Sequence, residues 1–322
     1  MNKRNFSLIE TVNSIINKRE LSTENQAVID AGREEMRKSG LSFDGNLVIP
    51  TENRSVSVTD TQGASVGVDV FDILAPLRDN SVLMKAGAKF LTGLQGNVKL
   101  PVMGGSGAQW EGEKETATGD AATFTSVELT PKRLAVTMAV SQQFLNQSSE
   151  SAEAILRQDM ANAISEKLQK TLLSNVISNP KAPKGIFAAT PDNAGSFKDI
   201  VTIESKVDDA NVGANRCYIL SNKAKAALRL MSKSDKGVAM VYENESIDGT
   251  PAYATSSVEG NGLLYGDFSQ LYVGQFGPIS LTVDPYSRAA SGEVVFTINA
   301  YFDGALARPT AVVSGDASKA TK

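Results

Sequence analysis

Residues 149–178, SESAEAILRQDMANAISEKLQKTLLSNVIS, carry the longest periodic pattern in the chain. Apolar residues recur at spacings of three to five, which predicts one amphipathic helix. Its apolar stripe consists of Ile155, Leu156, Met160, Ala163, Ile164, Leu168, Leu172, Val176 and Ile177. Its solvent-facing side consists of Arg157, Gln158, Asp159, Glu166, Lys167, Gln169 and Lys170. Such a helix would be roughly 40 Å long at 1.5 Å per residue, so we expect other elements to pack along it.

The composition excludes several classes of protein. The chain has 322 residues, a net charge of −4, one cysteine and no histidine. The absence of histidine rules out Ser-His-Asp and Cys-His catalysis and His-ligated zinc, and a single cysteine rules out thiolate metal clusters. The acidic balance argues against a dedicated nucleic-acid binder. We therefore expect a protein that is not an enzyme, has no cofactor or metal, and lacks a signal peptide and a membrane span.

The residues before the long helix divide into three stretches. Residues 5–39 predict two helices. Thr23 should cap the second helix, with Gln26 completing a capping box, and Gly40 should end it. The two helices either pack on the body as a helical hairpin or form a detachable segment that binds a partner. Residues 41–68 are polar and β-leaning, which indicates an extended arm. Residues 96–132 predict a long two-stranded hairpin with a polar tip. A hairpin this long buries little of itself, so we expect it to lie on another subunit.

The residues around and after the long helix predict a mixed α/β organisation. Leu134, Val136, Met138 and Val140 alternate as a half-buried strand before the helix. After it we expect strands at 217–221, where Cys217 is a core residue, and at 238–242, and a strand-turn-strand at 263–274. Ser221 or Asn222 should begin a helix, and Asp248-Gly249 should form a turn. A long return strand covers 294–302, and residues 314–322 predict a mobile tail.

Several motifs, taken in order, resemble the major capsid proteins of tailed phages with the HK97-type fold. They are Ala108-Gln-Trp-Glu-Gly-Glu-Lys, Thr130-Pro-Lys-Arg-Leu before the long helix, Lys184-Gly-Ile-Phe after it, Tyr265-Gly-Asp-Phe-Ser, and Asp303-Gly followed by Ala307-Arg-Pro-Thr-Ala. Each motif alone is weak, but their joint order spans residues 71–313. The resemblance implies an α+β fold, and hexamers and pentamers that close into an icosahedral head around double-stranded DNA.

The resemblance also assigns the segments. It implies an N-terminal helical segment (1–45), an extended N-arm and short compact stretch (46–95) and an extended loop, or E-loop (96–132). It further implies a peripheral (P) domain with a spine helix (133–184), an axial (A) domain (185–277), a P-domain return strand (278–313) and a flexible tail (314–322). Residues 1–45 could be a short scaffolding segment, and we expect it to stay uncleaved.

The subunit contacts are expected from the hairpin tip, the arm at 48–65 and the exposed charges. The acidic tip is expected to meet the outer face of the long helix. The candidate residues are Trp110, Glu111, Glu113, Lys114, Glu115, Lys132, Arg133, Arg157, Lys167, Lys170 and Arg308. Some related capsids cross-link a loop lysine to an asparagine with the help of a glutamate. Lys114 falls near the lysine's place, but Gly292 and Asn299 fall near the other two, so we expect no isopeptide bond.

The expected partners are other copies of the chain, the portal protein, packaged DNA contacted non-specifically, and possibly a scaffold, a protease and decoration proteins. The expected location is the virion, after assembly in the host cytoplasm, with no membrane involved. One alternative is an encapsulin, a nanocompartment shell of the same fold. An α/β enzyme using Asp208-Asp209 is disfavoured because no other ligand lies at suitable spacing. A tail, portal or decoration protein is disfavoured by the order of the motifs.

Overall fold

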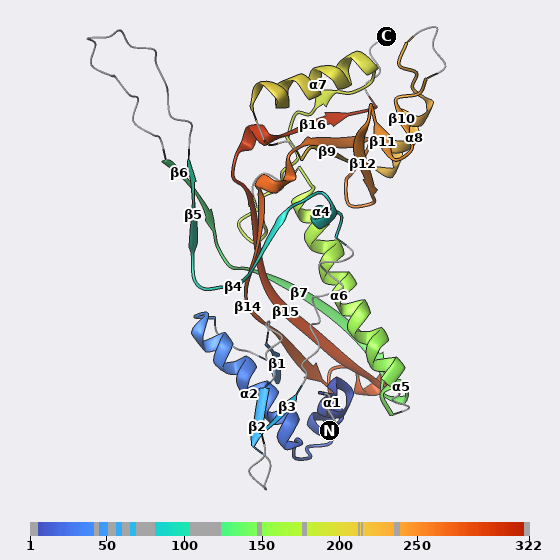
Figure 1. Cartoon of the computed structure of the whole chain (residues 1–322). Coiled ribbons are helices and arrows are strands. Elements are labelled where there is room, and N and C mark those ends of the chain that lie inside the picture. The colour runs from blue at the N-terminus through green and yellow to red at the C-terminus, as the bar shows by residue number, and fades with distance from the viewer. Residues whose placement is uncertain are drawn as a thin grey trace, which may run out of the picture.

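Two β-sheets organise the chain in the computed structural model (Figure 1). The model describes residues 6–41, 45–50, 56–59, 65–68, 81–103, 124–146, 150–175, 179–211, 213, 215–234 and 239–318. The main sheet has the order β1 (Leu47–Ile49), β14 (Leu271–Asp284), β15 (Glu293–Leu306), β7 (Lys132–Ser141), and β4 (Lys89–Leu94) runs parallel to β14. The second sheet has the order β10 (Tyr242–Glu243), β11 (Ser246–Ile247), β12 (Thr250–Thr255), β9 (Cys217–Ser221), β13 (Gly262–Gly266), β16 (Val312–Asp316), β8 (Asp192–Asn193).

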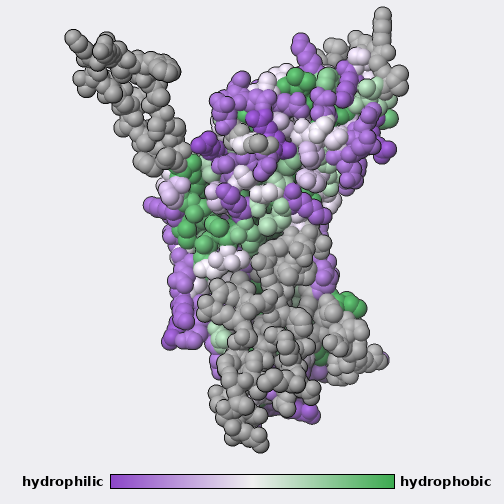
Figure 2. All heavy atoms as spheres, in the orientation of Figure 1, coloured by the Kyte–Doolittle hydropathy of each residue, from purple (hydrophilic) through white to green (hydrophobic). Residues whose placement is uncertain are grey.

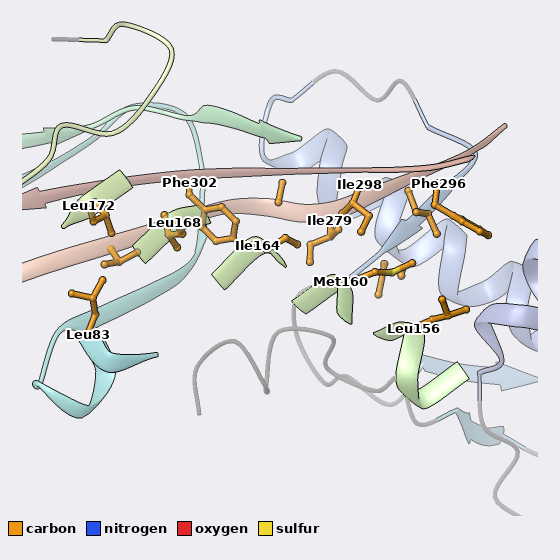
Figure 3. Packing of buried hydrophobic residues seen from close by; sticks show 14 of the residues in the cluster. Leu83, Leu156, Met160, Ile164, Leu168, Leu172, Ile279, Phe296, Ile298 and Phe302 are labelled. Atoms are coloured by element: carbon orange, nitrogen blue, oxygen red, sulfur yellow. The ribbon is translucent and has the colours of Figure 1, made fainter. Parts of the chain in front are cut away.

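The long helix, α6 (Glu150–Leu172), lies along one face of the main sheet (Figure 3). Leu156, Met160, Ile164, Leu168 and Leu172 point from it toward the strands and are buried. They meet alternate residues of β14 and β15, because side chains on a strand point to opposite faces in turn. The strand residues labelled in the figure are Ile279, Phe296, Ile298 and Phe302. The predicted helix is thus confirmed over 150–172, and β7 alternates as expected.

The helix ends earlier than the predicted Ser178, at Leu172. The carbonyl oxygen of Leu172 accepts a hydrogen bond from the Ile186 amide at 2.8 Å, and that of Ser174 accepts one from the Phe187 amide at 3.2 Å. The segment after the helix therefore takes the carbonyl groups that a longer helix would use. Residues 176–178 lie outside the described part.

Two side chains of α6 were assigned to the wrong face. Ile155 is 63% exposed, although it was placed in the apolar stripe. Gln169 is buried, although it was placed on the solvent side. Its Oε1 accepts a hydrogen bond from the Val82 amide at 3.1 Å, and its Nε2 donates to the Ser165 hydroxyl at 2.8 Å. Burial of this amide is possible because both of its polar groups are paired.

The two N-terminal helices, α1 (Leu8–Ile16) and α2 (Thr23–Lys38), pack on the body of the protein. α1 buries Leu8, Ile9 and Val12 in the same core as α6. α2 lies on β1 where Gly32 meets Val48, and a Cβ at Gly32 would lie 2.5 Å from the Val48 carbonyl oxygen. The helical hairpin on the body is therefore the alternative that the structure shows. The second helix is capped by Ser22 and not by Thr23, because the Ser22 hydroxyl accepts a hydrogen bond from the Asn25 amide.

The stretch predicted to be an extended, β-leaning arm forms strands where the structure describes it. Residues Leu47–Ile49 form the buried edge strand β1, which pairs with β14. β2 (Val56–Thr59) and β3 (Ser65–Val68) pair with each other as a hairpin. Both stretches contain alternating or consecutive β-branched residues, which favour strands over an irregular arm. Residues 69–80, which include the predicted compact stretch from Val70, lie outside the described residues.

Helices α7 (Phe197–Asp209) and α8 (Asn222–Leu230) cover one face of the second sheet. Tyr218 and Leu220 of β9 point into this layer. Cys217 and Ile219 point to the other side, into the core shared with the main sheet. Ser221 caps α8 as predicted, since its hydroxyl accepts from the Ala224 amide at 3.0 Å. The Asp248-Gly249 turn is also confirmed, with φ of +49° and +83°.

Two predictions for the C-terminal half are wrong. The strand expected at 238–242 is absent over Ala239–Val241, apart from a single bridge at Met240. The Val241 amide instead donates a hydrogen bond to the Met231 carbonyl at the end of α8. Strand β10 begins only at Tyr242. The tail expected to begin at Ser314 is ordered to Ser318, because β16 pairs with both β13 and β8. Ser314 also accepts the Ala188 amide at 3.1 Å. Within the described helices, none is long and apolar enough to cross a bilayer.

Candidate subunit interface

A two-stranded hairpin projects from the body beside the second sheet (Figure 1). Its strands are β5 (Val98–Met103) and β6 (Phe124–Leu129), paired antiparallel with Leu100 opposite Val127. The two-stranded hairpin predicted from the sequence is confirmed for these strands. Its tip at 104–123 lies outside the described residues, and with it Trp110, Glu111, Glu113, Lys114 and Glu115.

One face of the hairpin is almost entirely apolar, and the other face carries the charged residues of both strands. Directly opposed residues of an antiparallel pair share a face. One face therefore carries Val98, Leu100, Val102, Thr125, Val127 and Leu129, and we call it the apolar hairpin face. The opposite face exposes Lys99, Pro101, Ser126 and Glu128. Val98, Leu100, Val102 and Val127 are partly buried, so a fraction of this apolar surface still faces solvent.

Hydrophobic side chains also gather on the body where the hairpin joins it (Figure 2). Leu129, at the end of β6, is fully buried there. A Cβ on Gly274 of β14 would lie 2.7 Å from Leu94 Cδ1 and 3.2 Å from Leu129 Cδ1. Glycine at this position thus allows both leucines to pack against the backbone of β14.

The two basic candidates that follow the hairpin have partners in their own chain. Lys132 Nζ lies 2.7 Å from Asp303 Oδ2, and Arg133 Nε donates to Asn299 Oδ1 at 2.8 Å. Both pairs join β7 to β15. Sequence reasoning placed Lys132 and Arg133 at a subunit contact because their partners, more than 160 residues later, were not visible in the local pattern.

The other basic candidates are separate from this pair. Lys167 and Lys170 are exposed near the end of α6, while the side chain of Arg157 lies outside the described part. Arg308 is exposed and precedes the short 3-10 turn η3 (Pro309–Ala311). The structure therefore gathers Lys167 and Lys170 on one surface and leaves Arg308 at the connection from β15 to β16.

Two further lysines lie in the segment that follows α6. Lys181 and Lys184 are exposed in the segment that returns to the end of α6, held there by the Ile186–Leu172 hydrogen bond. We call Lys167, Lys170, Lys181 and Lys184 the lysine patch. Its signal was present in the sequence, since residues 166–184 hold these four lysines and one acidic residue, Glu166.

The end of the main sheet near α5 (Gln142–Asn146) exposes apolar side chains. Phe144 on α5 and Tyr286 in the β14–β15 turn are 37% and 70% exposed. The Gln142 amide donates to the Gly292 carbonyl, which ties α5 to this turn. The Asp284 carboxylate accepts from the Ser287 hydroxyl and the amides of Tyr286 and Ser287, and these bonds lower its pKa. The turn that carries Tyr286 is thus held by its own sequence.

The described residues offer little that is suited to catalysis or ligand binding. No group of three His, Cys, Asp or Glu among them could hold a metal ion. Burial raises the pKa of the Cys217 thiol to about 12, which disfavours the reactive thiolate at neutral pH. An apolar void of about 10 Å³ lies among Leu8, Ile49, Met160 and Ile298, which is at most the volume of one water molecule.

Solved structures share this fold. The fold is similar to the capsid of a native GTA particle, with a TM-score of 0.57 at 17% identity over 72% of this chain and 89% of that one. It is also similar to a structure from Gordonia phage Cozz, with a TM-score of 0.55 at 16% identity over 73% of this chain and 86% of that one. The fold is therefore that of HK97-like phage capsid subunits.

Sequence comparison gives the family. The model of the Phage capsid family matches residues 71–317, and the chain belongs to this family. The major capsid protein of Halomonas phage phiHAP-1 is 26% identical over 231 residues, or 69% of this chain. That of Klebsiella oxytoca phage phiKO2 is 24% identical over 245 residues, or 68% of this chain. The chain spans only 38% and 56% of the length of these two relatives.

Proposed function

We propose that this chain is a major capsid protein. It assembles into hexamers and pentamers that form the icosahedral head of a tailed phage around double-stranded DNA. The observation that carries this proposal is the apolar hairpin face: a member of the Phage capsid family projects a hairpin whose apolar side chains are left partly exposed in the single subunit. Exposed apolar surface of this kind marks protein–protein contacts.

In this proposal the hairpin is the E-loop, and its apolar face lies on a neighbouring copy. A ring of subunits uses heterologous contacts, in which the patch that is given differs from the patch that is received. The hairpin is the given patch, and the lysine patch receives the acidic segment Glu111–Glu115 of the neighbour. Phe144 and Tyr286 add a second apolar contact at the other end of the main sheet.

The proposal also covers the remaining roles. The shell forms in the host cytoplasm, receives DNA through a portal, and matures without an isopeptide bond. Asn299, near the place of the glutamate in cross-linking relatives, instead accepts a hydrogen bond from Arg133. The N-terminal helices stay attached, because α1 and α2 bury Leu8, Ile9, Val28 and Ile29 in the body. Because no isopeptide bond joins them, subunits of mature particles should migrate as monomers on a denaturing gel.

The experiment compares the two faces of the hairpin. Leu100→Lys places a charge on the apolar hairpin face, and the matched control Ser126→Lys places the same charge on the opposite face. Ser126 is exposed and Leu100 is partly buried, so thermal unfolding of unassembled subunits is measured first to show that both variants fold. Sedimentation velocity should show that Leu100→Lys fails to form capsomers and shells while Ser126→Lys assembles. Equal assembly by both variants would refute the role of this face.

A further inference from the structure

The hairpin returns to the body through Thr130, Pro131 and Lys132, and this segment meets one buried carboxylate. Asp303 Oδ2 accepts hydrogen bonds from the Thr130 amide at 2.8 Å and the Thr130 hydroxyl at 3.3 Å. The same oxygen lies 2.7 Å from Lys132 Nζ. Oδ1 accepts the amide of Gly304 at 2.9 Å. Three of these four donors therefore belong to the two residues Thr130 and Lys132 beside the hairpin.

Because Asp303 is buried, its carboxylate has little access to other hydrogen-bond donors. It is 3% exposed, so water does not replace a lost donor easily. A buried carboxylate that loses its hydrogen-bond donors is strongly unfavourable. The segment 130–132 is therefore held at the one position from which it can donate to Asp303.

Asp303 lies beside the apolar contacts at the same junction. It is paired in register with Gly274, against which Leu94 and Leu129 pack. Leu94 ends the strand that leads into the hairpin, and Leu129 ends the strand that leaves it. We call Leu94, Leu129, Gly274 and the Asp303–Lys132–Thr130 contacts the hairpin root.

We infer that Asp303 is a positioning residue that sets the direction in which the β5–β6 hairpin projects from the body. The apolar contacts at Gly274 hold the two strand ends together but are not directional. The charge-assisted bonds to Thr130 and Lys132 are directional, and they fix the orientation of the returning strand. Lys132 thus acts within its own chain by orienting the hairpin that carries the intersubunit contact.

Because the hairpin is long, a small rotation at its root produces a large displacement at its far end. The six residues of β6 span roughly 20 Å at about 3.4 Å per residue. A rotation of about 10° at Leu129 would move Phe124 by roughly 3–4 Å over this length, which is close to the separation of atoms in contact. A subunit with a loosened root would therefore present its apolar hairpin face in the wrong place. This consequence rests on the proposed function, whereas the positioning itself does not.

The test measures the direction of the hairpin in unassembled full-length subunits. Spin labels are attached to Ser126→Cys on the hairpin and Ser205→Cys on α7, both exposed, while the buried Cys217 stays unlabelled. The distance distribution between the labels should be narrow in the otherwise unchanged protein. Asp303→Ala should broaden it and shift its mean, with unchanged circular dichroism.

The matched control removes another ion pair on the same strand. Glu293→Ala breaks the Glu293–Arg288 contact (3.1 Å) at the far end of β15, and it should leave the distribution narrow. If Asp303→Ala fails to fold, Lys132→Met decides the question, because it keeps the carboxylate and the Thr130 donors. An unchanged distribution in a folded Asp303→Ala or Lys132→Met variant would overturn the inference.

A second readout separates this inference from the proposed function. The same variants without labels are tested for shell formation by sedimentation. A broadened distribution with lost assembly supports both the positioning by Asp303 and the contact made by the hairpin. A broadened distribution with normal assembly supports the positioning and contradicts the hairpin's role as a subunit contact.

Discussion

Burial of the Glu204 carboxyl on α7, beside Tyr218 of β9, makes the stability of the subunit depend on pH. The Tyr218 hydroxyl donates to Glu204 Oε1 at 2.6 Å. Burial raises the pKa of Glu204, and the bond from Tyr218 only partly opposes this shift. Because the pKa is raised on folding, the folded state binds the proton more tightly than the unfolded chain. The corresponding stability is present at low pH and is lost as the pH rises through the folded-state pKa.

Substitution of Glu204 should remove this dependence. Glu204→Gln keeps an acceptor for Tyr218 but has no charge to desolvate. It should therefore gain stability relative to the wild-type chain as the pH rises from about 4 to about 7, the range above the ordinary pKa of glutamate. Tyr218→Phe should have the opposite effect, because it removes the bond that favours the charged carboxylate. Urea unfolding of unassembled subunits measures both, and parallel pH profiles for all three proteins would contradict this account.

At the scale of elements, α6 stabilises the subunit through its apolar stripe. Leu172 is fully buried and packs against β15 at Gly304, where a Cβ would lie 2.6 Å from its Cδ2. Leu172→Ala should therefore cost about 2–5 kcal/mol of unfolding free energy, because a cavity remains. Ile155→Ala, on the same helix but exposed, should cost no more than about 0.5 kcal/mol. Chemical denaturation of unassembled subunits measures the difference, and similar losses would show that the stripe is wrongly assigned.

The elements that the sequence predicts well are those with local signals. The apolar spacing of α6, the alternation of β7 and the cap at Ser221 each depend on neighbouring residues, and each is found. The elements that were missed depend on distant partners. Leu47–Ile49 becomes a strand only because β14, more than 220 residues later, offers a free edge. Residues 312–316 become ordered only between β13 and β8, and Gln169 is buried only because Val82 supplies a donor.

The candidate interface, too, was predicted where its signals are local and missed where it depends on distant residues. The two strands of the hairpin and the basic residues of α6 were predicted from local patterns. Their organisation was not, because it depends on the tertiary fold: Asp303 meets Thr130 across 173 positions, and Lys184 reaches α6 through the Ile186–Leu172 bond. The exposure of Tyr286 depends on the turn that Asp284 forms, which the local pattern did not indicate.

At the scale of the whole molecule, the pairing of the acidic hairpin tip with the lysine patch predicts a charge swap. Glu111→Lys with Glu113→Lys should reduce assembly and its dependence on salt, since like charges would then meet. Lys167→Glu with Lys170→Glu should do the same. The four changes together should restore assembly, because opposite charges face each other again. Light scattering at several salt concentrations measures this, and failure of the combined variant to recover would argue against the pairing.

The most direct test of the account is electron microscopy of particles formed by the full-length chain, combined with the intact mass of their subunits. The account predicts closed icosahedral shells, in which hairpin density from each subunit lies on its neighbour and every subunit retains residues 1–45. A folded monomer that forms neither rings nor shells at any salt concentration or protein concentration would contradict it.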